Sequence, residues 1–503
     1  MDCFIGIDVG TSGCKIIAID AYARILKSAT EQYPCYSPQA DWSEQDPEDW
    51  WKGVCSGLKK ITASLGGHKI RAVGFSGQMH GMVALDENLH VVRRAILWND
   101  QRTTSQCDEI TKAAGGLEHL LSITNNQMLT GYTGGKILWM KENEPENYAR
   151  TKVVINPKDY IRFKLSGEVC TDMSDASGTG FFNVKERRWA FALMEKAGLD
   201  QTIFPKVVES THVAGCVTKE AAALTGLPEG TPLAGGGGDA VISTVGLGLV
   251  KPGRIGVTLG TSGVVAVNLP AFIRNPNGLL QVFCGNEPNL YSAMGVTLAA
   301  AGSYQWFHNV FGEWEKAAAK ENGKSAFALL DEEAEAVLAG ADGLIFLPYL
   351  TGERAPINDP KARGAFLGIT AHHSKGHFAR SVMEGVTFSL RQVYELIQQT
   401  GSGQSSDEIV LAGGGAKSPV WRQMFADIFE LPVRTVYGSS EGGSFGAALV
   451  AGVSVGAWKD LTQTVPLIES QSITKPNKKN IPLYEAQYQK YIKFYDALKW
   501  SYE

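Results

Sequence analysis

The sequence predicts an α/β protein made of two tandem halves, each built around a mixed β-sheet. The main observation is the tetrapeptide Gly-Thr-Ser-Gly, which occurs at 10–13 and again at 260–263, about half of the 503 residues further along. In both halves, segments of strand type alternate with segments of helix type. This alternation indicates helices layered on sheets, and a hairpin at the start of each half argues against a purely parallel sheet.

Both Gly-Thr-Ser-Gly segments are predicted to form the tips of β-hairpins. Apolar strand-type residues flank the first copy at 4–7 and 15–19, and the second at 255–259 and 264–267. Backbone N–H groups crowd together in such a turn and the hydroxyls add donors, which suits a phosphate oxygen. An ordinary hairpin remains the alternative for either copy taken alone. The predicted phosphate-binding residues are Gly10, Thr11, Ser12, Gly260, Thr261 and Ser262.

Composition and charge exclude several classes of partner. With 44% hydrophobic and 20% charged residues, each half is able to bury a substantial core. The net charge of −5 is spread along the chain without a basic stripe, which argues against nucleic acid, and no apolar run has the length of a membrane span. The eight cysteines form no C-x-x-C pair, which favours reduced thiols and a cytoplasmic location.

In the first half, a predicted helix is followed by a predicted sugar-binding loop. Asp46 and Pro47 have the residue types of an N-cap and a first helical position. The apolar segment 72–76 then reads as a buried strand, and ligand-binding groups gather at the ends of such strands. Amide, imidazole, carboxylate and guanidinium groups suit sugar hydroxyls, although each one alone is more often structural. The predicted sugar-binding residues are Gln78, Met79, His80, Trp98, Asn99, Asp100 and Arg102.

Asp239 is the predicted general base. It follows four glycines, 235–238, at the end of an apolar strand, so a substrate is able to approach the backbone closely. A helix N-cap role is compatible with this function. Just beyond it, 246–254 reads as a hinge, which predicts domains at 1–247 and 248–503 with a cleft between them.

In the second half, a glycine loop is predicted to bind nucleotide. The strand-type segment 409–412 leads into Gly413, and Gly414, Gly415 and Lys417 are the expected ATP-binding residues of this loop. The region 314–338 is predicted to be helical, exposed and interrupted at 322–323. A small-residue helix at 442–448 is expected to pack against the one after Asp239 and to form the seam between the halves.

Asp8 is the candidate metal ligand, together with Asp239. It stands two residues before the first glycine turn, and a carboxylate beside phosphate needs a cation between them; Mg²⁺ fits, unless Asp8 only stabilises the turn. The second turn has Thr258 at the matching place. Lys15, just past the first turn, is predicted to reach a phosphate oxygen, with a solvent-exposed lysine as the alternative.

These residues together resemble the FGGY family of carbohydrate kinases. One family signature matches at 131–143, and a second runs from 364–369 across 377–381 to Glu384. The resemblance implies two tandem actin-like (RNase H-like) ATPase domains, with Asp239 as proton acceptor and Met79 and His80 on a ketose. It also implies that Gly260, Thr261, Gly414 and Gly415 hold ATP.

The expected reaction is Mg²⁺-assisted, in-line phosphorylation of D-xylulose by ATP to D-xylulose 5-phosphate. The stretches 42–47, 76–81, 96–100, 157–160, 172–176 and 346–354 are similar to family members with that activity. Ala240 departs from the Asn that many of them have after the catalytic Asp, so another sugar such as ribulose or a polyol is the first alternative. An actin-like nucleotide switch is the second. The expected partners are a small sugar and ATP, with a homodimer as the oligomeric form to test.

Overall fold

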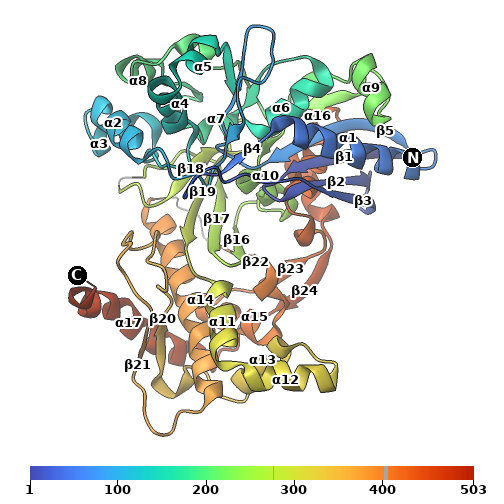
Figure 1. Cartoon of the computed structure of the whole chain (residues 1–503). Helices are drawn as coiled ribbons and strands as arrows, with labels where there is room; N and C mark the ends of the chain where they lie inside the picture. Colours follow the sequence, from blue (N-terminus) through green and yellow to red (C-terminus); the bar gives the residue numbers. More distant parts are fainter. Residues whose placement is uncertain (276, 402–405, 503) are drawn as a thin grey trace. The chain divides into compact units, whose positions relative to one another are not determined.

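The computed structural model describes residues 1–275, 277–401 and 406–502 and divides the chain into two compact units (Figure 1). The first unit contains Met1–Lys251, Asn268–Ser292 and Glu441–Ile468. The second contains Pro252–Val267, Ala293–Ser440 and Glu469–Glu503. Within the described residues, no helix combines the length and the apolar character needed to cross a membrane.

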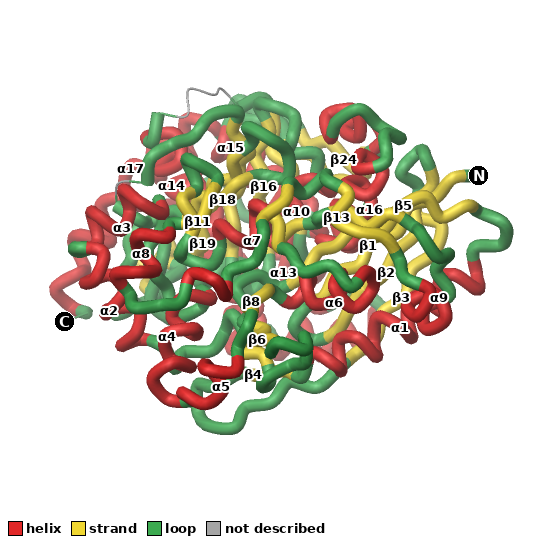
Figure 2. The backbone as a smooth tube through the Cα atoms, turned by 90° about the horizontal axis from the view of Figure 1, so that it is seen from above, coloured by secondary structure: helices red, strands yellow, loops and turns green. Residues whose placement is uncertain are grey.

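The sheet of the first unit begins with the predicted hairpin. β1 (Asp2–Val9) pairs antiparallel with β2 (Gly13–Asp20) and parallel with β5 (Lys69–Gly77), so the sheet is mixed. These strands run side by side in Figure 2. The strand order is β13-β14-β5-β1-β2-β3, with β15 paired to the end of β5. The remaining bounds are β3 (Ile25–Gln32), β13 (Val213–Cys216), β14 (Pro232–Ala234) and β15 (Gly237–Gly238).

One face of this sheet is covered by α1 (Pro47–Ser64). Ile5 and Ile7 of β1 are fully buried and share a hydrophobic core with Trp50 of α1. The helix starts where the sequence predicts, because the Asp46 side chain accepts the N–H of Glu48 at 3.0 Å. This capping satisfies one of the unpaired donors of the first turn.

The opposite face is covered by α16 (Gly443–Ser454), which the chain adds almost four hundred residues later. Side chains alternate between the faces of a strand, so Gly6 of β1 points to α16. A Cβ on Gly6 would lie 1.9 Å from Ser444 O, and one on Gly74 of β5 would lie 2.0 Å from Ala447 O. Only glycine at both strand positions lets this helix approach so closely.

Other elements of the first unit surround the sheet. The helices are α2 (Thr104–Ala114), α3 (Leu117–Thr124), α4 (Thr133–Asn143), α5 (Pro145–Arg150), α6 (Pro157–Ser166), α7 (Met173–Ser177), α8 (Phe191–Lys196), α9 (Lys219–Thr225) and α10 (Asp239–Gly246). The short strands are β4 (Glu44–Gln45), β6 (Val83–Leu85), β7 (Ala95–Ile96), β8 (Val153–Ile155), β9 (Thr171–Asp172), β10 (Phe182–Asn183), β11 (Arg188–Trp189), β12 (Val207–Val208) and β18 (Gln281–Cys284).

The second unit repeats the strand pattern of the first. β16 (Arg254–Leu259) pairs antiparallel with β17 (Gly263–Leu269) and parallel with β22 (Glu408–Ala412), as β1 does with β2 and β5. The second predicted hairpin is therefore confirmed. The strands follow the order β19-β17-β16-β22-β23-β24, where β19 is Tyr291–Thr297, β23 is Val433–Val436 and β24 is Ser470–Thr474.

The long helix α14 (Lys375–Gln399) organises the helical part of this unit. It packs against α11 (Ala301–Phe311), α13 (Ala326–Glu335) and α15 (Pro419–Phe429). The predicted interruption near 322 is confirmed, because α12 (Glu313–Asn322) ends at Gly323, whose φ is 68°. The remaining elements are β20 (Ile345–Leu347), β21 (Ala365–Leu367) and α17 (Ile481–Leu498).

The compact units depart from the predicted division at 247/248. The segments 268–292 and 441–468 belong to the first unit, so both small-residue helices lie within it. They do pack together as predicted, since a Cβ on Gly446 of α16 would lie 2.1 Å from Ile242 O of α10. In Figure 1 the red ribbon of α16 accordingly lies with the blue strands. The seam they form is internal to one unit because α16 also packs on Gly6 and Gly74 of that unit's sheet.

Candidate functional site

Strand pairing brings Asp8 and Asp239 to one edge of the first sheet. Asp8 on β1 is in register with Ser76 on β5, and Ser76 is in register with Gly237 on β15. Asp239 follows two residues after Gly237 and begins α10. The Ser76 hydroxyl donates to Asp8 Oδ1 at 2.6 Å, which fixes the direction of that carboxylate.

The environment of Asp239 suits a general base. Burial raises its pKa to about 7, and the negative charge of Asp8 adds to this rise. Burial also raises the pKa of Asp8, although the Ser76 hydrogen bond acts in the opposite direction. Asp239 Oδ1 accepts the N–H of Ala240 at 2.7 Å, which orients the carboxylate at the start of the helix. A carboxyl group with a pKa near 7 both accepts and releases protons at neutral pH.

The first glycine turn is closed by a hydrogen bond of 3.1 Å from Gly10 N to Gly13 O. Ser12 at its tip is exposed. Lys15 forms an ion pair of 2.8 Å with Glu441, so its ammonium group has a partner within the protein. Glu441 directly precedes the glycine pair that starts α16, and sequence reasoning did not single it out.

A hydrogen-bonded chain links this turn to the predicted sugar loop. Trp98 Nε1 donates to Thr11 Oγ1 at 2.9 Å, and Thr11 Oγ1 donates to Gln78 Oε1 at 3.2 Å. Gln78 is buried, whereas Trp98 is 46% exposed. The indole therefore presents an accessible apolar surface at the turn, as an aromatic face for a sugar ring would.

Met79 and His80 lie in a tightly constrained loop. Met79 is buried, and a Cβ on Gly238, the residue before Asp239, would lie 2.4 Å from its Cγ. His80 has a φ of 69°, a left-handed conformation that costs a non-glycine residue about 1–3 kcal/mol. Its ring stacks on Tyr132 at 4.5 Å, and its Nδ1 lies 2.6 Å from Gly178 O. These two ring contacts and the constrained backbone hold the imidazole in one orientation.

Asp100 and Arg102 are held in a buried ion-pair network. The Arg102 guanidinium is 2.7 Å from Asp100 and 2.9 Å from Glu44, and it stacks at 3.5 Å on the Trp42 ring. Both side chains are fully buried. This geometry gives them a framework role beneath the loop, whereas the neighbouring Asn99 is exposed.

The second unit contains a cavity of about 850 Å³ at the predicted nucleotide loops. Gly260 and Thr261 of the second turn lie on its wall, together with Gly414, Gly415 and Lys417 after β22. Ser262 is exposed and is not among the lining residues. The structure thus brings two separate predicted phosphate loops to one cavity of nucleotide size.

Sequence reasoning missed most of the apolar wall of this cavity. Tyr304 and Trp306 come from α11, Phe327 and Asp331 from α13, and Trp421 from α15. Tyr304 Oη donates to Asp331 Oδ1 at 2.9 Å, which ties two of these helices together. No local pattern marks these residues, because each helix has the periodicity of an ordinary amphipathic element.

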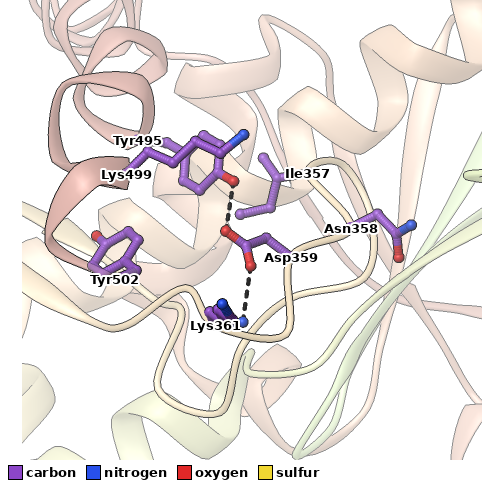
Figure 3. Close-up of a pocket in the computed structure, with 7 residues that line it drawn as sticks. All are labelled: Ile357, Asn358, Asp359, Lys361, Tyr495, Lys499 and Tyr502. Atoms are coloured by element: carbon purple, nitrogen blue, oxygen red, sulfur yellow. Dashed lines mark hydrogen bonds between the residues drawn. The ribbon is translucent and has the colours of Figure 1, made fainter.

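A second cavity in this unit, of about 270 Å³, contains none of the predicted site residues (Figure 3). Asp359 stands at its centre and accepts from Tyr495 Oη at 2.7 Å and from Lys361 N at 2.8 Å. Its carboxylate is satisfied by these contacts. The cavity therefore marks where the C-terminal helix packs on a loop.

The carboxylates of Asp8 and Asp239 are hard oxygen donors of the kind that Mg²⁺ prefers, so these residues fit such an ion. Among the described residues, one set of three close candidate ligands lies elsewhere, at Asp342, His372 and His377. His377 Nδ1 accepts the N–H of Ser374 at 3.0 Å, so its neutral ring carries the proton on Nε2, which faces Asp342 at 3.1 Å. A protonated Nε2 offers no lone pair to a metal, and this histidine instead caps α14.

Two family models match most of the chain. Residues 3–246 match the N-terminal domain of the FGGY family of carbohydrate kinases, and residues 256–455 match its C-terminal domain. The chain belongs to the FGGY family of carbohydrate kinases. The two matched ranges meet near the predicted boundary.

Individual FGGY kinases match over nearly the whole chain. The xylulose kinase of Bacillus subtilis (strain 168) is 36% identical, covering 98% of this chain and 97% of the relative. The gluconokinase of the same strain is 31% identical over 89% of this chain and 86% of its own length. The crystal structure of xylulose kinase from Rhodospirillum rubrum has a TM-score of 0.91 with 27% identity, covering 99% of each chain.

The two FGGY signatures occupy defined places in the fold. The first, 131–143, is the loop before α4 and the helix itself. The second, 364–384, comprises β21 and the first half of α14, where Arg380 forms a buried ion pair of 2.7 Å with Glu384. The second signature therefore includes a structural ion pair, whereas the first lies directly beside His80.

Proposed function

We propose that this carbohydrate kinase transfers the γ-phosphoryl group of ATP to D-xylulose. The observation that carries the proposal is the placement of Asp239, with a pKa of about 7, beside Asp8 at the sheet edge. The nucleotide-sized cavity at Gly260 and Gly414 supports ATP as donor. The full-length similarity to xylulose kinases supports the choice of sugar.

Asp239 is the proposed proton acceptor. The terminal hydroxyl of the ketose loses its proton to the carboxylate while its oxygen forms a bond to the γ-phosphorus. The bond from that phosphorus to the β,γ-bridging oxygen breaks, and ADP leaves with the electron pair. The transfer requires the terminal phosphoryl group of ATP to reach the hydroxyl beside Asp239.

Asp8 and Asp239 are the residues that would hold Mg²⁺. When bound, the ion offsets the negative charge that accumulates on the phosphoryl oxygens. The N–H groups and hydroxyls of the turns at 10–13 and 260–263 are further donors for those oxygens. Lys15 contributes through its ion pair with Glu441, which we propose orients its ammonium group near the first turn.

The proposed sugar contacts come from three segments of the first unit. Met79 and His80 face the substrate beside Asp239, and Trp98 supplies an apolar surface. Asn99 adds an exposed hydrogen-bonding group, and the buried Gln78 orients Trp98 through Thr11. The buried pair of Asp100 and Arg102 supports the loop from below. Because residue 240 is alanine and not asparagine, the chain has no side-chain amide next to Asp239 to contact the sugar. The identity of the sugar therefore needs a direct test.

The deciding experiment measures ADP release with a coupled assay across D-xylulose, D-ribulose, polyols and gluconate. We expect D-xylulose to give the highest kcat/KM. Gluconate is included because a gluconokinase is among the relatives. A higher kcat/KM with gluconate or D-ribulose would reject the proposed substrate, and ATP consumption that no carbohydrate stimulates would favour a nucleotide switch.

A further inference from the structure

Lys136 is a fully buried lysine beside the sugar loop. It stands in the first turn of α4, and its side chain is inaccessible to solvent. Among the described residues, no carboxylate lies within ion-pair distance of its Nζ. A buried ammonium group normally needs such a partner, so its contacts must come from neutral acceptors.

Those acceptors are two backbone carbonyl groups. Lys136 Nζ donates to His80 O at 2.7 Å and also to Gly131 O. The hydroxyl of Thr133 donates to the same His80 carbonyl at 3.1 Å. Two side chains from the start of α4 therefore converge on one oxygen of the sugar loop.

The carbonyl that they hold belongs to the strained residue of the loop. His80 has the left-handed φ of 69°, and its ring is fixed between Tyr132 and Gly178. A backbone conformation of this kind persists only where surrounding contacts determine it. By donating to the His80 carbonyl, Thr133 and Lys136 of α4 fix the direction in which that carbonyl points.

We propose that Lys136 is a positioning residue of the sugar site, which clamps the His80 carbonyl to the start of α4 and so fixes the imidazole that contacts the sugar. This inference rests on the proposed sugar-kinase function. Burial lowers the pKa of Lys136 to about 7. Even the neutral amine keeps two N–H donors for its two carbonyl partners, so the clamp does not depend on the charge.

The clamp acts on binding more than on the chemical step. A displaced imidazole contacts the sugar less well in both the ground state and the transition state, so the KM for the sugar rises while kcat changes little. A role confined to overall folding would instead reduce the active fraction and leave both KM values unchanged.

The test compares Lys136→Met with Lys141→Met. Lys141 lies on the same helix and also donates from Nζ to a backbone carbonyl, that of Gly198, away from the sugar loop. We expect Lys136→Met to raise the sugar KM about tenfold or more, with kcat and the KM for ATP within about twofold of wild type. We expect Lys141→Met to leave all three unchanged. An unaltered sugar KM in Lys136→Met would overturn the proposal.

Thr133→Val provides a second, milder variant that removes the other donor to His80 O. Its sugar KM should rise in the same direction, and the double variant should show a non-additive effect because both donors act on one carbonyl. Should Lys136→Met fail to fold, Thr133→Val decides the outcome. A Thr133→Val enzyme with wild-type sugar KM would then count against the clamp.

Hydrogen exchange separates failure of the clamp from failure of the proposed function. Peptides covering 78–82 should exchange faster in the Lys136 or Thr133 variant than in wild type and in Lys141→Met, whatever sugar the enzyme accepts. Unchanged exchange would reject the clamp. A wild-type protein that releases no ADP with any sugar would reject the kinase proposal independently.

Discussion

Asp239→Asn tests the chemical core of the proposed mechanism. The amide is nearly isosteric, and its oxygen still accepts the N–H of Ala240, which lies 2.7 Å from Asp239 Oδ1 in the native protein. The start of α10 therefore keeps its local geometry. What the variant loses is the ability to accept a proton and the negative charge beside Asp8.

The expected fall in kcat follows from the pKa of this carboxyl group. With a pKa of about 7, roughly half of the molecules carry the basic form at neutral pH, near the optimum for a general base. Such a base contributes about 10²–10⁴-fold, or about 3–5 kcal/mol of transition-state stabilisation. We expect kcat to fall by that factor, while the Kd for ATP stays within about threefold.

The assay is ADP release with saturating sugar, combined with calorimetric titration of a non-hydrolysable ATP analogue. Ala240→Ser, a substitution at the neighbouring exposed position, serves as a control for disturbance of the helix start. A kcat of Asp239→Asn within tenfold of wild type would remove Asp239 from the role of base.

The same variant makes a prediction about stability. The pKa of Asp239 rises from 3.8 to about 7 on folding, which corresponds to at most about 4 kcal/mol. Because the folded-state pKa is the higher one, the carboxyl group costs little below pH 3.8, and the protein loses stability as the pH rises from 3.8 through 7. Without divalent cations, Asp239→Asn should therefore have a Tm a few degrees above wild type at pH 8, with the difference shrinking towards pH 5. If the Tm of Asp239→Asn at pH 8 were equal to or below that of wild type, burial of the Asp239 carboxylate would not be destabilising.

Four further variants probe the rest of the site. Arg102→Met leaves the buried Asp100 carboxylate without its cation and should cost about 3–5 kcal/mol, seen as a lower Tm, and it should also raise the sugar KM of the folded enzyme because the pair supports the sugar loop; an unchanged Tm would show that the network is dispensable. Gly414→Val should raise the KM for ATP about tenfold with a wild-type Tm, because a Cβ there meets nothing within 4 Å and lies on the nucleotide cavity. Gly413→Ala should lower the Tm instead, because its φ is 89° and its Cβ would lie 2.4 Å from Leu259 O. A lower Tm in Gly414→Val together with a raised KM for ATP in Gly413→Ala would exclude the loop from ATP binding. Asp8→Asn should raise the Mg²⁺ concentration for half-maximal activity at least about tenfold, and wild-type turnover that survives chelation of divalent cations would argue against a metal at Asp8.

Local physics explains which elements the sequence predicts well. The two glycine turns, the Asp46 cap and the break at Gly323 depend on residues within a few positions of one another. Such signals are visible without tertiary structure, since turn and cap geometry is set by the chain itself. The sequence does not predict that α16 belongs to the first unit, because its place depends on contacts with Gly6 and Gly74, more than 350 residues away.

Among the site residues, sequence alone indicated chemistry but not environment. Arg102 and Asp100 have the side chains of sugar ligands, yet the structure buries them in an ion pair. Lys15 is paired with Glu441 from the far end of the chain. The aromatic wall of the nucleotide cavity comes from three separate helices, and no spacing along the chain indicates their meeting.

Local sequence is enough to predict the duplicated hairpins, the glycine loops and a carboxylate, Asp239, at the end of a glycine run, because backbone conformation and residue type specify these features locally. Tertiary packing pairs β15 with β5 and β5 with β1, which brings Asp239, two residues after Gly237, to the sheet edge that carries Asp8. Burial at that place raises the pKa of Asp239 to about 7. Tertiary packing also brings Lys136 Nζ within hydrogen-bond distance of the His80 carbonyl. Burial and charge proximity depend on which distant segments pack together, and they set the pKa of Asp239 and the hydrogen-bond partners of Lys136.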